Sequence, residues 1–320
     1  MSSNTFLLKY GSMKKKTLII ATRESSLALW QANWVKNQLE KTHADLSITL
    51  FGMTTEADKM LAVPLYKMGG KGLFVKELED ALYAKQADIA VHSMKDVPMI
   101  LPEGLCVPVM CEREDPRDAF VSNDYTSLSD LPENAIVGTS SLRRQSQLLA
   151  HHPHLKTAFL RGNVTTRLSK MDQGDYASII LAAAGLKRLG LAERIRSFLS
   201  TDEMLPAAGQ GILGIECRMD DEETRALIAP LDHVQSHQCA LAERAMCRHL
   251  GGGCHVPIAA YAEIQGDQLY LRGLVADPTG TKIIRSERTD VSSRAEEIGM
   301  AVAEDLLRQG AKKLLDIARE

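Results

Sequence analysis

The chain has 320 residues, of which 45% are hydrophobic and 25% are charged, and its formal net charge is −3. This length and composition predict a globular protein of two or three domains, with a core large enough to need no disulfide bonds. A slightly acidic chain whose basic residues are scattered among turns excludes a general nucleic-acid binder and favours small anionic ligands. Six irregularly spaced cysteines indicate reduced thiols and a cytoplasmic setting. No apolar run reaches the roughly 18 residues of a membrane span.

The N-terminal part of the chain alternates short apolar runs with helical patterns, which is typical of an α/β fold with mainly parallel sheets. Each apolar run is too short for a helix, and each helical pattern repeats apolar side chains every three or four positions. We predict strands at 17–22, 48–51 and 88–92, and helices at 27–41 and 74–84.

Charged and hydroxyl side chains follow two of these strands. Arg23 and Ser25 stand between the first strand and the first helix, where free N–H groups and the helix dipole favour an anion. Lys95 and Asp96 follow the third strand, at the sheet edge where open α/β folds bind ligands. There Lys95 would neutralise a ligand carboxylate, and Asp96 would act as a general acid–base or stabilise a cation. Taken one at a time, the two motifs fit a plain helix cap and a surface Lys–Asp pair equally well.

A glycine-rich loop at 65–72 carries Lys71. It differs from the phosphate loop of nucleotide-binding proteins, because Lys71 is followed by Gly72 where that motif has Ser or Thr. We therefore predict no nucleotide site here and interpret the loop as a mobile lid beside a substrate site.

The charge-dense, proline-containing segment 108–118 predicts a crossing between two domains. Beyond it the alternation repeats, with strands predicted at 135–138, 157–160 and 178–181, each followed by a turn and a helix. Basic and hydroxyl residues again lie at the strand ends or on the helices that follow. They are Ser141, Arg143, Arg144, Arg161, Arg167 and Arg188.

Five basic residues along the chain share one local setting, at or just beyond the C-terminal end of a strand. They are Arg23, Lys95, Arg143, Arg161 and Arg167. One such residue is weak evidence, but a single cleft lined for several carboxylates or phosphates explains all five together. The planar fork of arginine suits bidentate pairing with carboxylates.

The C-terminal part of the chain changes character. A strand predicted at 212–216 is expected to return the chain to the first domain, as in two-lobed binding folds with paired crossings. From about residue 234 the pattern is that of a smaller α+β unit, with a helix at 236–250, strands from 258, at 268–276 and at 282–288, and a closing helix at 293–315. The predicted domains are 14–111 with 212–230, then 117–206, then 234–320.

Three glycines, Gly251 to Gly253, separate the helix at 236–250 from Cys254. Gly251 is expected to end that helix. Because a helix C-terminus carries partial negative charge, Cys254 is a poor activated nucleophile, although it can project into a cavity and hold a group. From the loop alone, ordinary packing of a small thiol is the better interpretation. The neighbouring Cys and His residues lack zinc-ligand spacing, so no metal site is predicted.

Seven segments together resemble the porphobilinogen deaminase (hydroxymethylbilane synthase) family. They are 21–28, 69–77, 92–96, 112–120, 138–144, 160–163 and 252–254. So many matches in the same order are specific, and they cover nearly the whole chain after residue 13.

The resemblance implies an α/β fold of two periplasmic-binding-protein-like lobes, with mixed, mainly parallel sheets, and a smaller α+β C-terminal domain. It implies a transferase of haem and tetrapyrrole biosynthesis that polymerises four porphobilinogen molecules, releases ammonia at each step and hydrolytically releases hydroxymethylbilane. The primer would be a dipyrromethane cofactor attached to Cys254 through a thioether. We expect a cytoplasmic monomer whose partner is the small-molecule substrate, with no nucleic acid and no membrane.

The same resemblance assigns roles to the charged residues. Asp96 would stabilise the azafulvenium cation left when ammonia departs and would also move protons, and Lys71 would lie on the lid. The cofactor would be held by Lys95, Asp96, Ser141, Arg143 and Arg144, and the incoming substrate by Arg23, Ser25, Arg161, Arg167 and Arg188. The alternative is a cytosolic two-lobed binding or sensor protein for a small carboxylate ligand.

Overall fold

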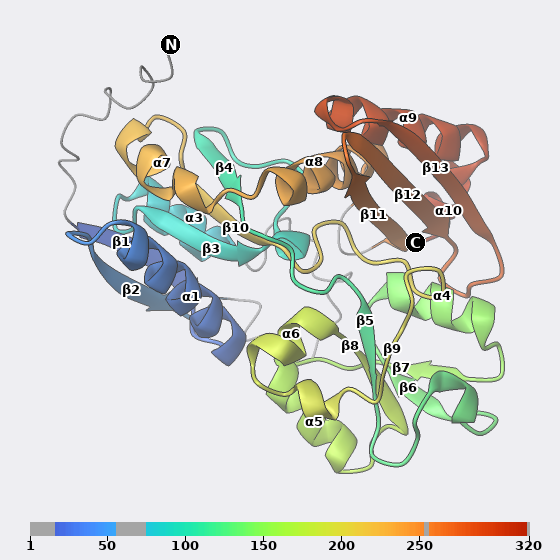
Figure 1. Cartoon of the computed structure of the whole chain (residues 1–320). Coiled ribbons are helices and arrows are strands. Elements are labelled where there is room, and N and C mark those ends of the chain that lie inside the picture. The colour runs from blue at the N-terminus through green and yellow to red at the C-terminus, as the bar shows by residue number, and fades with distance from the viewer. Residues whose placement is uncertain (1–16, 56–74, 253–255, 319–320) are drawn as a thin grey trace.

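The computed structural model describes residues 17–55, 75–252 and 256–318, and its strands form three sheets in three parts of the molecule (Figure 1). The first sheet has the strand order β2-β1-β3-β10-β4. Strand β1 is parallel to β2 and β3, whereas β10 is antiparallel to β3 and β4. These strands are β1 (Thr17–Arg23), β2 (Ser47–Met53), β3 (Ile89–Ser93), β4 (Leu105–Met110) and β10 (Leu213–Arg218). The chain therefore does return to its first sheet after the second one is complete.

Three helices accompany the first sheet, namely α1 (Ser26–Thr42), α3 (Lys76–Tyr83) and α7 (Glu222–Ile228). Helix α1 buries Val35 and Leu39 against Leu18 and Ile20 of β1, which have no exposed surface. This packing holds β1 in place, so the residues that follow its end have a fixed position.

The second sheet repeats the plan with the order β7-β6-β8-β5-β9. Strand β6 is parallel to β7 and β8, and β5 is antiparallel to β8 and β9. The strands are β5 (Asp118–Val121), β6 (Ile136–Gly138), β7 (Lys156–Ala158), β8 (Ser178–Ala182) and β9 (Ser197–Phe198). The helices that follow β6, β7 and β8 are α4 (Leu142–His151), α5 (Val164–Asp172) and α6 (Ala183–Arg188).

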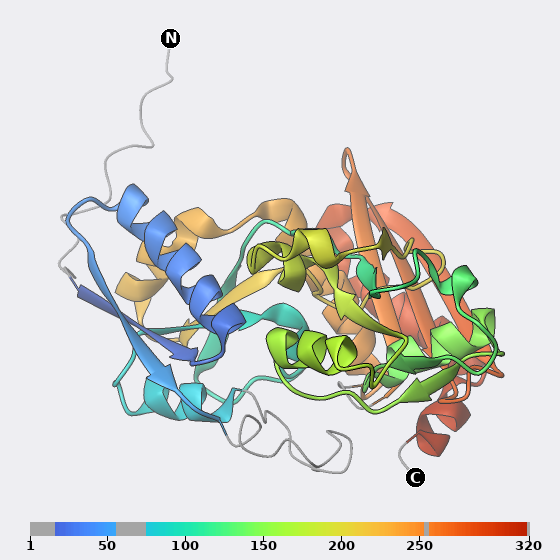
Figure 2. The same cartoon turned by 90° about the horizontal axis from the view of Figure 1, so that it is seen from below.

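The third sheet is an antiparallel meander of β11 (Ile258–Gln265), β12 (Gln268–Ala276) and β13 (Ile283–Val291). It packs with α8 (Val234–His249), α9 (Ala295–Arg308) and α10 (Ala311–Ile317), and Figure 2 shows the three strands of this sheet on the side of the molecule away from β1 and β2. The predicted fold class, two lobes with mixed sheets and a smaller C-terminal unit, is confirmed. No helix within the described ranges is long and apolar enough to cross a membrane.

Three predicted elements differ from the structure. The crossing expected from residue 108 begins later, because β4 continues through Pro108 to Met110. Proline is tolerated there because β4 is an edge strand. The strand predicted at 157–160 ends at Ala158. The single helix predicted at 293–315 is two helices, because Gly310 adopts a left-handed conformation with φ of 98° between α9 and α10.

Gly209 brings the segment between the second and first sheets against the turn that follows β3. Its φ is 73°, and a Cβ at this position would lie 2.8 Å from the Cβ of Met94 and 3.3 Å from the backbone nitrogen of Lys95. Only a residue without a side chain permits this approach at this φ. The position of Lys95 thus depends on a glycine in the segment that returns from the second sheet to the first.

We expect Gly209→Ala to lower the free energy of unfolding by about 3 kcal/mol, measured by urea denaturation. The matched control is Gly190→Ala, which also places a side chain at positive φ (70°) but has no atom within 4 Å of the new Cβ. Its loss should be about 1 kcal/mol. Equal losses in the two variants would show that the contact with Met94 is not the cause.

Candidate active site

One cavity of about 330 Å³ is lined by residues from all three parts of the molecule. Its first-lobe residues follow β1 and β3, its second-lobe residues follow β6, β7 and β8, and Cys247, Val256 and Ile258 come from the C-terminal unit. The predicted cofactor and substrate residues that the structure describes all line it. They are Arg23, Ser25, Lys95, Asp96, Ser141, Arg143, Arg144, Arg161, Arg167 and Arg188. Cys254 and Lys71 lie outside the described residues.

The first lobe presents its polar groups through short turns at strand ends. Arg23 is the last residue of β1, and Ser25 is the N-cap of α1, whose Oγ accepts a hydrogen bond from the Ala28 N–H at 3.4 Å. Lys95 and Asp96 belong to one 3₁₀ turn, Met94–Asp96, directly after β3. That turn is held by Met94, whose N–H donates to the Ile212 carbonyl at 3.0 Å.

The second lobe uses two helix N-termini. Ser141 caps α4 by accepting from the Arg144 N–H at 3.4 Å, so Arg143 and Arg144 lie in the first turn of that helix. Asn163 caps α5 by accepting from the Thr166 N–H at 2.8 Å. Arg167 lies one turn further and donates from Nε to the Gly162 carbonyl at 2.8 Å. Both caps fix arginines beside a helix end that itself favours anions.

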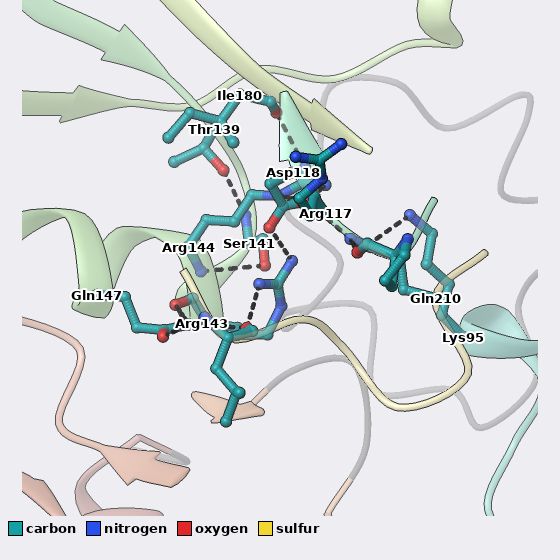
Figure 3. A network of polar contacts seen from close by, with 12 residues as sticks. Lys95, Arg117, Asp118, Thr139, Ser141, Arg143, Arg144, Gln147, Ile180 and Gln210 are labelled. Carbon is teal, nitrogen blue, oxygen red and sulfur yellow. Dashed lines mark hydrogen bonds and ion pairs between the residues drawn. The ribbon is translucent and has the colours of Figure 1, made fainter. Parts of the chain in front are cut away.

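Asp118 joins the two arginines of α4, whose residues line the cavity (Figure 3). It is the first residue of β5 and has no exposed surface. Nη2 of Arg143 and Nη2 of Arg144 each lie 2.8 Å from one of its carboxylate oxygens. Burial raises the pKa of Asp118, but Arg143 and Arg144 outweigh that effect and hold the pKa below its usual range. The two guanidinium groups are therefore locked in place by one shared buried anion.

Gln210 extends this network towards the first lobe (Figure 3). Its Nε2 donates to Asp118 at 2.9 Å and to the Pro116 carbonyl at 2.7 Å, while its Oε1 accepts from Lys95 Nζ at 3.3 Å. The side chain thus bridges the turn after β3 and the buried ion pair of the second lobe.

Sequence reasoning missed the roles of Asp118 and Gln210. An acidic residue at the head of the apolar run Ala119 to Val121 was a usable signal, because a charge that starts a buried strand needs a partner. Nothing in the sequence marks Gln210 as a site residue, since it stands between two glycines in a connecting segment.

The cavity holds a surplus of positive charge. Among its described lining residues seven are Arg or Lys, and Asp96 is the one carboxylate. Burial, and then the charge of Arg144, lower the pKa of Lys95 to about 8, although Asp96 and Asp118 oppose the shift. Burial also lowers the pKa of Arg167 and that of Arg188 to about 10. Cations held this far from water and this close together are stabilised when an anionic ligand joins them.

No group of three or more His, Cys, Asp or Glu side chains in the described ranges has the arrangement of a metal site.

Residues 18–226 match the family model described as porphobilinogen deaminase, dipyromethane cofactor binding domain, and residues 237–308 match that of the porphobilinogen deaminase C-terminal domain. The chain belongs to the porphobilinogen deaminase family. It is a transferase (hydroxymethylbilane synthase) that polymerises porphobilinogen in tetrapyrrole biosynthesis and uses a dipyrromethane cofactor. The predictions of family, activity and cofactor are confirmed, and the alternative of a binding or sensor protein is not better supported.

Solved structures that match a large part of the chain do so at low sequence identity. The methionine-binding protein MetQ is 13% identical, with a TM-score of 0.44 over 70% of this chain and 90% of its own. A lipoprotein of the YaeC family from Enterococcus faecalis is 16% identical, with a TM-score of 0.42 over 68% of this chain and 92% of its own. Similarity this low supports no conclusion about ligand or activity.

We expect the cofactor-free protein to bind dicarboxylate pyrroles, the units of its cofactor, more weakly as the pH rises through about 8, because Lys95, which is expected to hold the cofactor's carboxylates, loses its charge there. A cation with a lowered pKa is charged below that value and neutral above it, so the loss between pH 7 and pH 9 should reach about tenfold. Titration calorimetry measures it on protein made in cells that lack porphobilinogen. Lys95→Arg should remove this loss of affinity, because arginine stays charged between pH 7 and pH 9. A loss of the same size in Lys95→Arg would assign the titration to another group.

Proposed function

We propose that the cavity divides its basic residues between the dipyrromethane cofactor and the incoming porphobilinogen. Lys95, Asp96, Ser141, Arg143 and Arg144 hold the cofactor, to which Cys254 forms the thioether. The observation that carries the proposal is that the ten described candidate residues, dispersed over residues 23–188, line one cavity.

The donor set fits the proposed cofactor. Dipyrromethane is built from two pyrrole units, each with an acetate and a propionate, and the described lining has seven basic side chains and one carboxylate. Arg143 and Arg144 are rigid donors, because Asp118 and the carbonyls of Leu205 and Ile180 fix their orientation. When bound, the cofactor supplies the primer onto which further pyrrole units are added.

The substrate carboxylates are proposed to bind across both lobes. Arg23 and Ser25 come from the first lobe, and Arg161, Arg167 and Arg188 come from the second. Two other parts of the chain position Arg188. Its Nη2 donates to the Gly211 carbonyl of the returning segment at 2.6 Å, and its guanidinium lies 5.9 Å from the ring centre of Trp30 on α1. A ligand held between the lobes is oriented before reaction, which lowers the entropic part of the barrier.

Asp96 is the proposed catalytic residue. It follows Lys95 in the same tight turn and lies within electrostatic range of Arg167. A carboxylate here stabilises the positive charge that develops on the substrate ring as ammonia leaves, and it can take up the proton lost from the ring after coupling.

Two proposed residues lie outside the described ranges. Cys254 is supported by its neighbours in the chain, because Cys247 and Val256 line the cavity and the Gly252 N–H donates to the Cys247 carbonyl at 2.8 Å. Lys71 is proposed as a lid residue from the family resemblance alone.

We further propose a cytoplasmic monomer that needs no nucleic acid and no membrane. A net charge of −3 with basic groups gathered in a cavity supports a small anionic ligand. The domain boundaries at 14–111 with 212–230, 117–206 and 234–320 are part of the same proposal, and β10 within the first sheet supports the paired crossing.

We expect the purified enzyme to carry a mass addition of dipyrromethane size on the peptide that contains Cys254, and Cys254→Ser to carry none. Intact mass and peptide mapping measure this. Cys247→Ser is the matched control, because it removes the other cysteine at the cavity and should leave the addition in place. An active protein with an unmodified Cys254 peptide would refute the attachment.

Asp96→Asn should reduce the rate of bilane formation by about 10²- to 10⁴-fold while the cofactor addition and the thermal midpoint stay close to those of the wild type. Asp267→Asn, an exposed turn residue, serves as control and should keep full activity. Formation of linear bilane is followed after quenching. A rate within threefold of the wild type would remove Asp96 from the mechanism.

A further inference from the structure

Two cysteines outside the cavity face each other across neighbouring strands. Cys106 on β4 and Cys217 on β10 are direct partners in the antiparallel register. Their sulfur atoms lie 3.9 Å apart. Neither residue lines the cavity, and the proposed function uses neither thiol.

The two thiols have unequal surroundings. Cys106 is partly exposed, whereas Cys217 has no exposed surface. The hydrogen bond between them lowers the pKa of Cys106 and raises that of Cys217. Arg225 adds a nearby positive charge that also favours the Cys106 thiolate. One member of the pair is therefore reachable and nucleophilic, and the other is a protected thiol within reach of it.

Other described cysteines differ from Cys106. Cys111 is 1% exposed and Cys239 is 7% exposed. Burial raises the pKa of each of these thiols to about 12. A reagent in solution should thus distinguish Cys106 from them by exposure and by thiolate character.

We propose that Cys106 and Cys217 form a redox pair that a hydroperoxide oxidises reversibly to a disulfide. The Cys106 thiolate attacks the peroxide oxygen, the O–O bond breaks, and with hydrogen peroxide a sulfenic acid and hydroxide result. The Cys217 thiol then attacks the sulfenic sulfur, and its proton leaves with the hydroxyl as water. In sum, two thiols and one hydrogen peroxide give one disulfide and two waters, so the peroxide is reduced by the two electrons that the sulfurs lose.

The local backbone can accommodate the bond. The sulfurs must approach by about 2 Å to reach the disulfide length. Among the strands that the structure describes, β4 lies at the edge of its sheet and has β10 as its one neighbour, so it can shift without breaking a second described ladder. The register between β4 and β10 is irregular between Ile215 and Cys217, and such bulges tolerate local adjustment.

The disulfide would close a long loop. Cys106 and Cys217 are 111 positions apart, and the chain between them includes the whole second sheet. Cross-linking residues so distant restricts the unfolded chain strongly, so oxidation should raise the unfolding temperature by about 5 °C or more.

The test treats the holoenzyme with hydrogen peroxide, blocks remaining thiols with iodoacetamide and maps peptides by mass. We expect the Cys106 and Cys217 peptides to be joined with the loss of two hydrogens, and dithiothreitol to separate them. Cys106→Ser should form no such product, while the matched control Cys111→Ala should form it as the wild type does. Recovery of both peptides as separate alkylated thiols in the wild type would overturn the proposal.

A thermal measurement supplies the second criterion. The rise in unfolding temperature after peroxide should appear in the wild type and in Cys111→Ala and be absent from Cys106→Ser and Cys217→Ser. A rise that persists in Cys106→Ser, or a cross-link that joins Cys106 to another cysteine, would equally contradict the pair.

Discussion

The cavity depends on one buried carboxylate. Asp118, without exposed surface, is shared by Arg143 and Arg144, so two guanidinium groups lose much of their hydration against a single anion. Removing one partner of a buried ion pair lowers the free energy of unfolding by about 3–5 kcal/mol, which shows how strongly such an anion holds its cations. Because Asp118 compensates only part of their charge, the remainder faces the cavity. Asp118 therefore stabilises the fold locally, and the positive charge that it leaves uncompensated attracts a polycarboxylate ligand.

A second buried carboxylate fixes the C-terminal unit to this arrangement. Glu243 of α8 accepts from Arg113 of the outgoing crossing at 2.8 Å, from the Gly209 N–H of the returning segment at 2.7 Å and from the Ala262 N–H of β11 at 2.8 Å. Burial raises the pKa of Glu243, and Arg113 opposes the shift. Since Gly209 in turn packs on Met94, the helix that precedes the cysteine loop is coupled to the turn that carries Asp96. These contacts connect the first lobe, the returning segment and the C-terminal unit beside the cavity.

The sequence could predict what depends on local periodicity and not what depends on contacts far along the chain. Apolar runs located most strands, and strand ends identified the basic residues, while the family resemblance gave them roles. Pro108 suggested the start of a crossing because it precedes the charged run at 112–118, yet it occupies an edge strand where its missing N–H matters little. Gly310 was absorbed into a helical pattern because a single glycine does not reveal its φ. Gln210 could not be recognised at all, because its function is to meet Lys95 and Asp118, which lie 115 and 92 positions away.

The cavity is small compared with the chain that the enzyme builds. Its volume of about 330 Å³ is near the lower limit of ligand pockets, so a chain that grows by four units requires it to widen. The two crossings are bonded to each other where they pass, since the Glu114 N–H donates to the Gly211 carbonyl at 3.1 Å and Gly211 leaves no room for a side chain. They are therefore expected to turn together as one hinge. The contact from Lys95 to Gln210, at 3.3 Å, is longer than the 2.9 Å contact from Gln210 to Asp118. The turn that carries Asp96 is also held by the Met94 N–H, which donates to the Ile212 carbonyl at 3.0 Å, so loss of the Lys95 contact alone would not release it.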